Sequence, residues 1–312
     1  MNYTLRRLLA CLLLCLCTLT AAAQTRTVRQ RIAHLLREKH ATVGVAVLTD
    51  DGVRIRCNDR RRYPLMSVFK LHVALALLDR MEREQISLDS LIRIETSQLL
   101  PDTYSPLRDR YGCREITLPL RELLRYSLSL SDNNACDILI GLAGGIDSVS
   151  GYLCRIGARG FALSQTEDDM HRDIRNSYKN RSRPSATVLL LHRTLERSLL
   201  RPDHRDFLRD CLIATSTGPD KLKGMLPEGT IVAHKTGSSD RTPQGIKIAD
   251  NDVGMILLPD GRRCYIAVFV SESRESDTDN AALIARIARI VYDGLSGRES
   301  APLPPIARAG RK

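Results

Sequence analysis

The sequence contains no tryptophan, and aromatic residues make up only 4% of its 312 residues. Proteins that bind single-stranded nucleic acid usually stack bases on aromatic side chains, which are scarce here. The formal net charge is +11, but the 47 Lys and Arg residues are scattered among 36 Asp and Glu residues. We therefore interpret the positive charge as a basic, solvated surface and expect no nucleic-acid partner.

Long apolar runs are missing as well, since none reaches the roughly 20 residues that a membrane-spanning helix needs. The chain starts with Arg6 and Arg7, followed by an apolar run over 8–19 and then three alanines. This order is typical of a secretory signal that is cleaved. We expect residues 1–23 to be removed, with no stable membrane insertion of the mature chain and a periplasmic or secreted location. A lipoprotein anchor at Cys11 is the alternative.

Clusters of metal ligands are also missing. Beyond the signal, six cysteines are widely separated: Cys57, Cys113, Cys136, Cys154, Cys211 and Cys264. None of them has the spacing of a metal site, and the seven histidines are dispersed, so we expect no metal and no cofactor. The six cysteines are compatible with disulfides, which export permits, and equally with free thiols in the core.

Apolar segments predict strands near both ends of the chain. Val43–Leu48 and Val53–Arg56 flank an Asp-Gly turn, which is typical of a hairpin. Three more strands are expected at Thr230–His234, Val253–Leu258 and Cys264–Val270, the last two joined by a Pro-Asp-Gly turn. If the hairpins pair, one sheet contains segments from both ends of the chain.

Helical spacing of apolar residues dominates from Ser67 to about Leu226. We therefore predict an α/β fold (an α+β sandwich) in which a five-stranded antiparallel sheet is flanked by helices and carries an inserted all-helical subdomain. The expected boundaries are 24–66 and 215–296 for the α/β part, 67–214 for the helical part and 297–312 for a disordered tail. The interface between the two parts is the natural cleft for a ligand.

Three short elements carry candidate chemistry. Ser67 is followed by Lys70 one helical turn later, where an amine can assist a serine nucleophile. Ser131-Asp132-Asn133 lies between two predicted helices, and Lys235-Thr236-Gly237-Ser238 leaves a predicted strand. Each element alone has a plainer explanation: a helix cap for the first two, and an exposed edge strand with a protective lysine for the third.

Together, these elements occur in the order that class A β-lactamases and penicillin-binding proteins share. With Thr217-Gly218-Pro219 and Ala233-His234, the sequence resembles the branch of class A that contains extended-spectrum enzymes and anaerobe cephalosporinases. The resemblance covers nearly the whole chain after the signal. It implies the fold of serine β-lactamases and DD-peptidases, and a small β-lactam substrate.

The resemblance also implies a role for Glu167, on an Ω-type loop near 163–183, as the base that delivers water to the acyl-enzyme. The family usually has an asparagine four residues later to help hold that water, and His171 stands there. Gln165 occupies the place of the arginine in a common loop-bracing ion pair, so we expect an altered loop.

The remaining roles follow the family pattern. Ser67 would attack the lactam carbonyl, with Lys70, or Glu167 through a water, accepting its proton, and Ser131 would pass a proton to the ring nitrogen. Backbone N–H groups of Ser67 and Ser238 would stabilise the oxyanion. The expected substrate-binding residues are Asn133 for the acylamino group and Lys235, Thr236 and Ser238 for the carboxylate, with Gly237 allowing close approach. Lys221 or Arg241 would replace a missing arginine that supports the carboxylate.

Two other functions share the three elements. A DD-peptidase would lack Glu167, and a non-hydrolytic β-lactam-binding module would need a membrane-signalling segment. We therefore expect a monomeric β-lactamase that hydrolyses penicillins and, because Ser238 offers the carboxylate another donor, especially cephalosporins.

Overall fold

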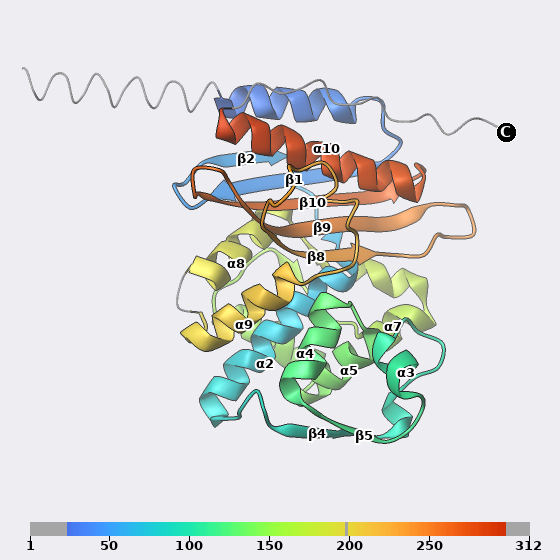
Figure 1. Ribbon diagram of the computed structural model, residues 1–312. Coiled ribbons are helices and arrows are strands. Elements are labelled where there is room, and N and C mark those ends of the chain that lie inside the picture. Colours follow the sequence, from blue (N-terminus) through green and yellow to red (C-terminus); the bar gives the residue numbers. More distant parts are fainter. Residues whose placement is uncertain (1–23, 197–198, 298–312) are drawn as a thin grey trace, which may run out of the picture.

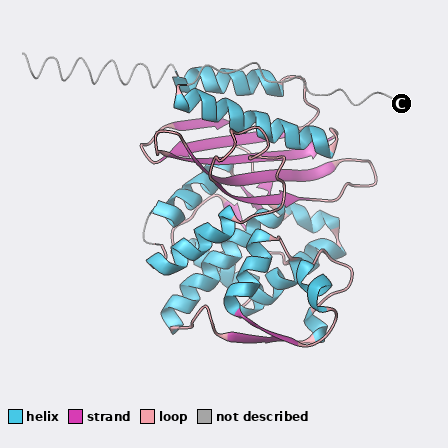
Figure 2. Ribbon diagram, viewed as in Figure 1, coloured by secondary structure: helices cyan, strands magenta, loops and turns pink. Residues whose placement is uncertain are grey.

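The computed structural model describes residues 24–196 and 199–297, so the predicted signal and the tail after Gly297 lie outside the described residues. One antiparallel sheet of five strands lies between helices on both faces (Figures 1 and 2). Its order is β2-β1-β10-β9-β8, from β1 (Thr42–Thr49), β2 (Arg54–Cys57), β8 (Val232–Ser238), β9 (Lys247–Leu257) and β10 (Arg263–Ser273). The predicted sheet from both chain ends is confirmed.

Successive residues of the central strands face opposite layers of the molecule. A helix over residues 24–36 and α10 (Asp277–Ser296) cover the outer face of the sheet (Figure 1). Val45 and Val47 of β1 are buried against this outer layer, whereas Ala46 between them is buried against the helical block. The sheet therefore separates two apolar cores, and both of its faces are covered.

The inner face of the sheet packs on a block of helices. These are η1 (Met66–Phe69), α2 (Lys70–Glu84), η2 (Thr96–Gln98), α3 (Pro106–Tyr111), α4 (Leu120–Ser129), α5 (Asn133–Leu142), α6 (Ile146–Arg155), α7 (Glu167–Arg172), η3 (Ile174–Tyr178), α8 (Pro184–Glu196) and α9 (Pro202–Ile213). Every residue of α2 from Lys70 to Leu78 is buried. A helix that is buried on all sides lies at the centre of its layer, and α2 is surrounded by other helices.

The fold class is as predicted, but the inserted block is not purely helical. β4 (Leu91–Ile94) pairs with β5 (Ile116–Pro119). A second small sheet has the order β3-β7-β6, from β3 (Tyr63–Pro64), β6 (Phe161–Ala162) and β7 (Arg181–Ser182). Strands of two to four residues are too short to show a period of two, which is why apolar spacing did not predict them. The second sheet joins the segment before Ser67 to both ends of the loop that contains Glu167.

The six described cysteines are all free, and Cys136, Cys211 and Cys264 are buried. Of the two alternatives left open, the structure has free thiols.

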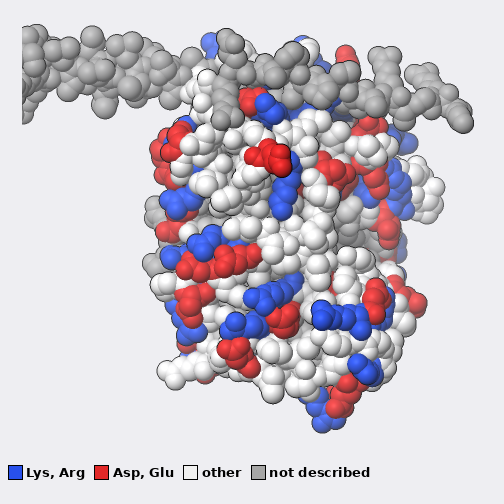
Figure 3. Space-filling model, viewed as in Figure 1, with Lys and Arg blue, Asp and Glu red and all other residues white. Residues whose placement is uncertain are grey.

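Charges of both signs alternate over the face shown in Figure 3, in agreement with a mixed, solvated surface. Within residues 24–196 and 199–297, no single helix is long and apolar enough to span a membrane; α5 and α6 reach that length and composition only as a pair bent by 67°.

Candidate active site

Ser67 lies in η1, directly before α2, at the boundary between the sheet and the helical block. The preceding residue, Met66, has a φ of 47°, a left-handed conformation that is unfavourable for a residue with a side chain. Strain of this kind persists only where the surroundings hold the backbone. Here Asn251 of β9 donates from Nδ2 to the carbonyl oxygens of Pro64, at 2.8 Å, and Leu65, at 3.1 Å. The sheet therefore fixes the segment that presents Ser67.

Lys70 is fully buried and directs its ammonium at three acceptors. Its Nζ lies 2.5 Å from the carbonyl oxygen of Ser131, 2.6 Å from Oδ1 of Asn133 and 3.0 Å from Oε1 of Glu167. A lysine ammonium has three N–H donors, and these three acceptors match them. The Ser67 hydroxyl donates to the same Glu167 oxygen at 3.2 Å. The nucleophile and the amine, predicted from one motif, therefore meet the carboxylate predicted from a second, distant segment.

Asp132 caps a helix, while its two neighbours, Ser131 and Asn133, contact Lys70 in the site. Asp132 is the N-cap of α5, accepting from the backbone N–H of Ala135 at 2.8 Å, and it also accepts from Leu107 at 2.6 Å. Burial raises the pKa of its carboxyl, although these backbone hydrogen bonds act in the opposite direction. Ser131, with a φ of 60°, and Asn133 stand on either side and both contact Lys70. The cap explanation is correct for Asp132 and leaves its neighbours facing the cleft.

Lys235 lies on β8, an edge strand, but it does not protect that edge from solvent. Its side chain is fully buried and its Nζ donates to Oγ of Ser131 at 2.9 Å and to the carbonyl oxygen of Thr236 at 3.0 Å. Burial, and after it the nearby charge of Lys70, lower the pKa of Lys235 well below its ordinary value. The edge-strand explanation is therefore wrong for this residue.

Gly237 lies where β8 passes behind the nucleophile. A Cβ added there would lie 2.5 Å from the carbonyl oxygen of Leu65 and 3.1 Å from the backbone nitrogen of Val68. Only glycine allows this close approach without movement of one of the two segments. Thr236, next to it, shares a hydrogen bond of 2.6 Å between its Oγ1 and that of Thr217.

Glu167 is the first residue of α7 and is buried. Asp137, on α5, accepts the backbone N–H groups of Glu167 at 2.8 Å and of Asp168 at 2.9 Å. Burial, and after it the charge of Glu167, raise the pKa of Asp137 to about 7. Our sequence analysis gave Asp137 no role, although its position four residues after Asn133 on a helix was a signal that both share a face.

Asn180 braces the base of the same loop and was also not predicted. Its Oδ1 accepts the backbone N–H groups of Ser164 at 2.9 Å and Gln165 at 3.0 Å, and its Nδ2 donates to the carbonyl oxygen of Gln165 at 2.8 Å. The side chain is fully buried. A neutral amide thus holds the loop at the place where Gln165 had suggested that a bracing ion pair is missing.

A cavity of about 340 Å³ opens in front of these groups. Its lining includes Ser67, Asn133, Glu167, His171 and Ser238. Lys70, Ser131 and Lys235 lie behind this lining and reach it through the contacts given above. All the predicted catalytic residues and most of the predicted substrate-binding residues therefore surround one cleft.

The two cations considered as carboxylate supports are both engaged elsewhere. Lys221 is buried and forms an ion pair with Asp250. Its aliphatic chain lies close to Thr236, because a Cβ added at Gly218 would come within 3.0 Å of both side chains. Arg241 donates to Asp277 at 2.5 Å and to two backbone carbonyl groups. Neither is among the residues lining the cleft, and of the two Lys221 is the one whose side chain lies near Thr236.

Within the described residues, no group of three or more His, Cys, Asp or Glu side chains is arranged to hold a metal ion.

Comparisons with known proteins agree on one family. Residues 27–295 match the model of the beta-lactamase enzyme family. A beta-lactamase of Bacteroides uniformis is 52% identical over 282 residues, which are 90% of this chain and 95% of the relative. The extended-spectrum beta-lactamase PER-1 of Pseudomonas aeruginosa is 36% identical over 272 residues, 87% of this chain and 88% of that protein.

Solved structures of class A and extended-spectrum beta-lactamases are also similar to this chain in fold and sequence. A class A beta-lactamase from Bacteroides cellulosilyticus superposes with a TM-score of 0.86 at 51% identity, covering 88% of this chain and 99% of the other. The TLA-3 extended-spectrum beta-lactamase has a TM-score of 0.86 at 41% identity, covering 87% and 99%.

Proposed function

The chain belongs to the beta-lactamase enzyme family as a class A β-lactamase, and from this premise we propose how its cleft opens and hydrolyses the β-lactam ring. Enzymes of this class are hydrolases of β-lactams, and this activity confers resistance to β-lactam antibiotics. The observation that carries the mechanism is the position of Glu167 Oε1. This oxygen accepts a hydrogen bond from the Ser67 hydroxyl at 3.2 Å and forms an ion pair with Lys70 Nζ at 3.0 Å.

In the first step, Ser67 Oγ attacks the lactam carbonyl carbon, and Glu167 accepts the proton of the Ser67 hydroxyl. Lys70 is less suited to this task in the resting enzyme, because its three donors already face acceptors. The role of Lys70 is to pass a proton to Ser131 and then to take up the proton that Glu167 accepted from Ser67, so that Glu167 can act as a base again. Backbone N–H groups of Ser67 and Ser238 stabilise the charge on the carbonyl oxygen, where one lost donor typically costs about 3 kcal/mol of barrier.

In the second step, the bond between the carbonyl carbon and the ring nitrogen breaks, and Ser131 donates a proton to that nitrogen. Its Oγ lies within reach of both Lys70, at 3.4 Å, and Lys235, at 2.9 Å, from which the proton can be replaced. Asn133 orients the acylamino group of the substrate. Lys235, Thr236 and Ser238 bind the carboxylate, while Lys221, whose charge is paired with Asp250, packs its aliphatic chain near Thr236.

In the third step, water enters between Glu167 and the acyl-enzyme ester. The water oxygen attacks the ester carbonyl carbon while Glu167 accepts a proton from the water. The bond from that carbon to Ser67 Oγ then breaks, and the proton passes from Glu167 to Ser67. His171 lines the cavity beside Glu167 and is placed to help hold the water. Ser238 at the mouth of the cleft favours substrates whose carboxylate is on a six-membered ring, so we propose that cephalosporins are good substrates.

We also propose that residues 1–23 direct export to the periplasm or the medium, and that the mature enzyme acts there as a monomer without inserting into a membrane. The expected subdomains, 24–66 with 215–296 and 67–214, meet at the cleft. The apolar run over 8–19, which lies outside the described residues, supports the export proposal.

The variant Glu167→Ala tests the mechanism. Without Glu167 the ion pair of Lys70 is lost, and Lys70 can accept the Ser67 proton in its place, so the variant should still form an acyl-enzyme with a cephalosporin, seen by mass spectrometry as a lasting mass increase. Its turnover number should fall about 10³-fold because general base catalysis of deacylation is lost. Asp168→Ala, in which the neighbouring acid that pairs with Arg172 is removed, is the control and should keep its turnover. Fast turnover by Glu167→Ala would contradict the assignment.

A further inference from the structure

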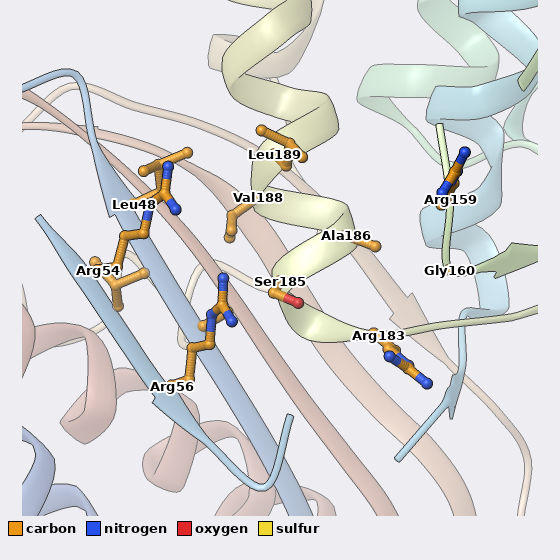
Figure 4. Close-up of a pocket in the computed structure, with 12 residues that line it drawn as sticks. Leu48, Arg54, Arg56, Arg159, Gly160, Arg183, Ser185, Ala186, Val188 and Leu189 are labelled. Atoms are coloured by element: carbon orange, nitrogen blue, oxygen red, sulfur yellow. The ribbon is translucent and has the colours of Figure 1, made fainter. Parts of the chain in front are cut away.

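A second hollow, which shares no lining residue with the active cleft, is lined by four arginines. Arg54 and Arg56 of β2, Arg159 of the segment before β6 and Arg183 of the segment before α8 surround a cavity of about 250 Å³. Figure 4 shows Arg54 and Arg56 extending from β2 toward the first turns of α8, where Ser185 lies, with Arg159 and Arg183 beyond that point. We call this hollow the arginine cleft.

The positive charge of the arginine cleft is largely uncompensated. The described residues give the side chains of Arg54, Arg159 and Arg183 no hydrogen bond and no ion pair. Arg56 has one acid nearby, Asp59, at 3.9 Å, and this acid already accepts a backbone N–H at 2.7 Å. By contrast, Arg262 and Arg263 at the start of β10 pair with four different acids: Asp50, Asp51, Glu196 and Asp260. Four exposed guanidinium groups around one cavity therefore offer an anion donors that protein acids leave almost entirely unoccupied.

The floor of the arginine cleft is apolar. Leu48 and Ala46 of β1 contribute to one side, and Ala186, Val188 and Leu189 of α8 contribute to the other. Leu189 is 48% exposed, so the apolar floor of the cleft reaches solvent. A ligand that satisfied both surfaces would carry negative charge and an apolar part.

The basic surface continues past the edge of the sheet. An adjoining hollow of about 520 Å³ shares Arg54 and Arg56 and adds Arg26 and Arg29 from the helix over 24–36. The charge around β2 therefore exceeds what a single carboxylate would neutralise. A phosphate monoester carries a charge of about −1.5 to −2 near pH 7 and accepts paired hydrogen bonds from the planar guanidinium fork.

We propose that the arginine cleft is a binding site for an organic phosphate with an apolar substituent. The phosphate lies among the guanidinium groups of Arg54, Arg56, Arg159 and Arg183, and the apolar part lies on Leu48 and the exposed side of α8. The same chemistry is present in soluble phosphate esters and in the headgroups of anionic phospholipids.

Occupation of this site would act on the loop that contains Glu167. Arg159 and Gly160 lie just before the loop and Arg183 just after it, and the backbone N–H of Arg183 donates to the carbonyl oxygen of Gly160 at 3.3 Å. A Cβ added at Gly160 would lie 2.9 Å from that of Ala186, so the start of the loop packs directly on α8. A bound phosphate would therefore connect β2 with both ends of the loop and stabilise its base.

Titration calorimetry with octyl phosphate below its aggregation concentration tests the proposal, with octyl glucoside as the uncharged comparison. We expect one octyl phosphate per chain, weaker binding as salt is raised, and no comparable binding of octyl glucoside. Arg159→Gln/Arg183→Gln and Arg54→Gln/Arg56→Gln should each weaken binding about tenfold or more, as expected for loss of charge-assisted hydrogen bonds.

The matched control is Arg114→Gln/Arg274→Gln, which removes the same charge at two exposed arginines away from the cleft. All variants should hydrolyse a chromogenic cephalosporin normally, which shows that they are folded. The proposal is overturned if octyl phosphate does not bind, or if the cleft variants bind it as well as the control. Sedimentation with phosphatidylglycerol and phosphatidylcholine vesicles separates the two sources: cleft-dependent binding to the anionic vesicles alone identifies a lipid headgroup, whereas binding of octyl phosphate without vesicle binding identifies a soluble ester.

Discussion

Lys235, Thr236 and Gly237 form one wall of the active cleft as consecutive residues of β8, and the backbone hydrogen bonds of a five-stranded sheet determine their positions. Glu167 forms the opposite wall on α7, a helix of six residues whose place depends on side chains from elsewhere. We call these the strand wall and the loop wall. The part of the site that holds the substrate is therefore set by repeated backbone pairing, and the part that activates water is set by a few buried polar groups.

The difference predicts how each wall responds to change. Many backbone hydrogen bonds support β8, so only a change that forces β8 away from the Ser67 segment should reduce activity. The loop wall depends mainly on Asn180 and Asp137, so removing a single polar atom should affect it. Binding and turnover should accordingly be separable by mutation.

Among changes to the residues that support the two walls, the largest effect is expected for Gly237→Ala in the strand wall. The new Cβ would lie 2.5 Å from the carbonyl oxygen of Leu65, so β8 and the Ser67 segment must separate. Displacements of about 1 Å in an active site can cost a factor of about 100, and we expect kcat/KM for a chromogenic cephalosporin to fall by that amount. Gly151→Ala in α6 is the control, because a Cβ there meets no atom within 4 Å. A folded Gly237→Ala enzyme with normal kcat/KM would show that the strand wall is less rigid than described.

An intermediate effect is expected for Asn180→Ala in the loop wall. The change leaves the buried backbone groups of Ser164 and Gln165 without their partner, and the free energy of unfolding in urea should fall by about 2 kcal/mol. We expect kcat to fall about tenfold while KM does not rise, because deacylation suffers and substrate binding does not. Asn176→Ala, which removes a single hydrogen bond from the same loop, should have a smaller effect. A rise in KM without a fall in kcat would remove the distinction between the walls.

The smallest effect on turnover is expected for Asp137→Asn, which should instead change the pH dependence of stability. The pKa of Asp137 is raised from 3.8 to about 7 in the folded chain, so its neutral form favours folding. This contribution is complete below pH 3.8 and is lost as the pH rises through 7, with a slope of at most about 1.4 kcal/mol per pH unit. Urea unfolding from pH 4 to 8 should show the wild type losing stability relative to Asp137→Asn. A constant difference between the two proteins across this range would mean that Asp137 does not titrate there.

Most of the strand wall and less of the loop wall could be predicted from the sequence. The hairpin around Asp51-Gly52 has clear signals, and Lys235-Thr236-Gly237 is recognisable as a motif. The full burial of Lys235 was not predictable, because burial depends on Ser131, more than 100 positions away. Hydrogen bonds between distant segments leave no local pattern.

The loop wall shows the same limit more strongly. Gln165 indicated that a common brace is missing, but nothing in the sequence near it identifies Asn180 as the replacement. Asp137 was visible only as a residue four positions after Asn133 on a predicted helix. Lys221 was considered as a partner for the substrate carboxylate, and its pairing with Asp250 depends on the register of β9 against β8.

The central pairing of β1 with β10 joins Thr42 to Ser271 and Thr49 to Cys264, residues more than 200 positions apart. Closing so long a loop is slow, because its entropy cost comes before most of the stabilising contacts form. While β10 has yet to be synthesised, β1 can pair only with β2, and a two-stranded hairpin is marginally stable by itself. Nascent chains of this protein thus remain uncommitted to the native state until almost all of the polypeptide is available.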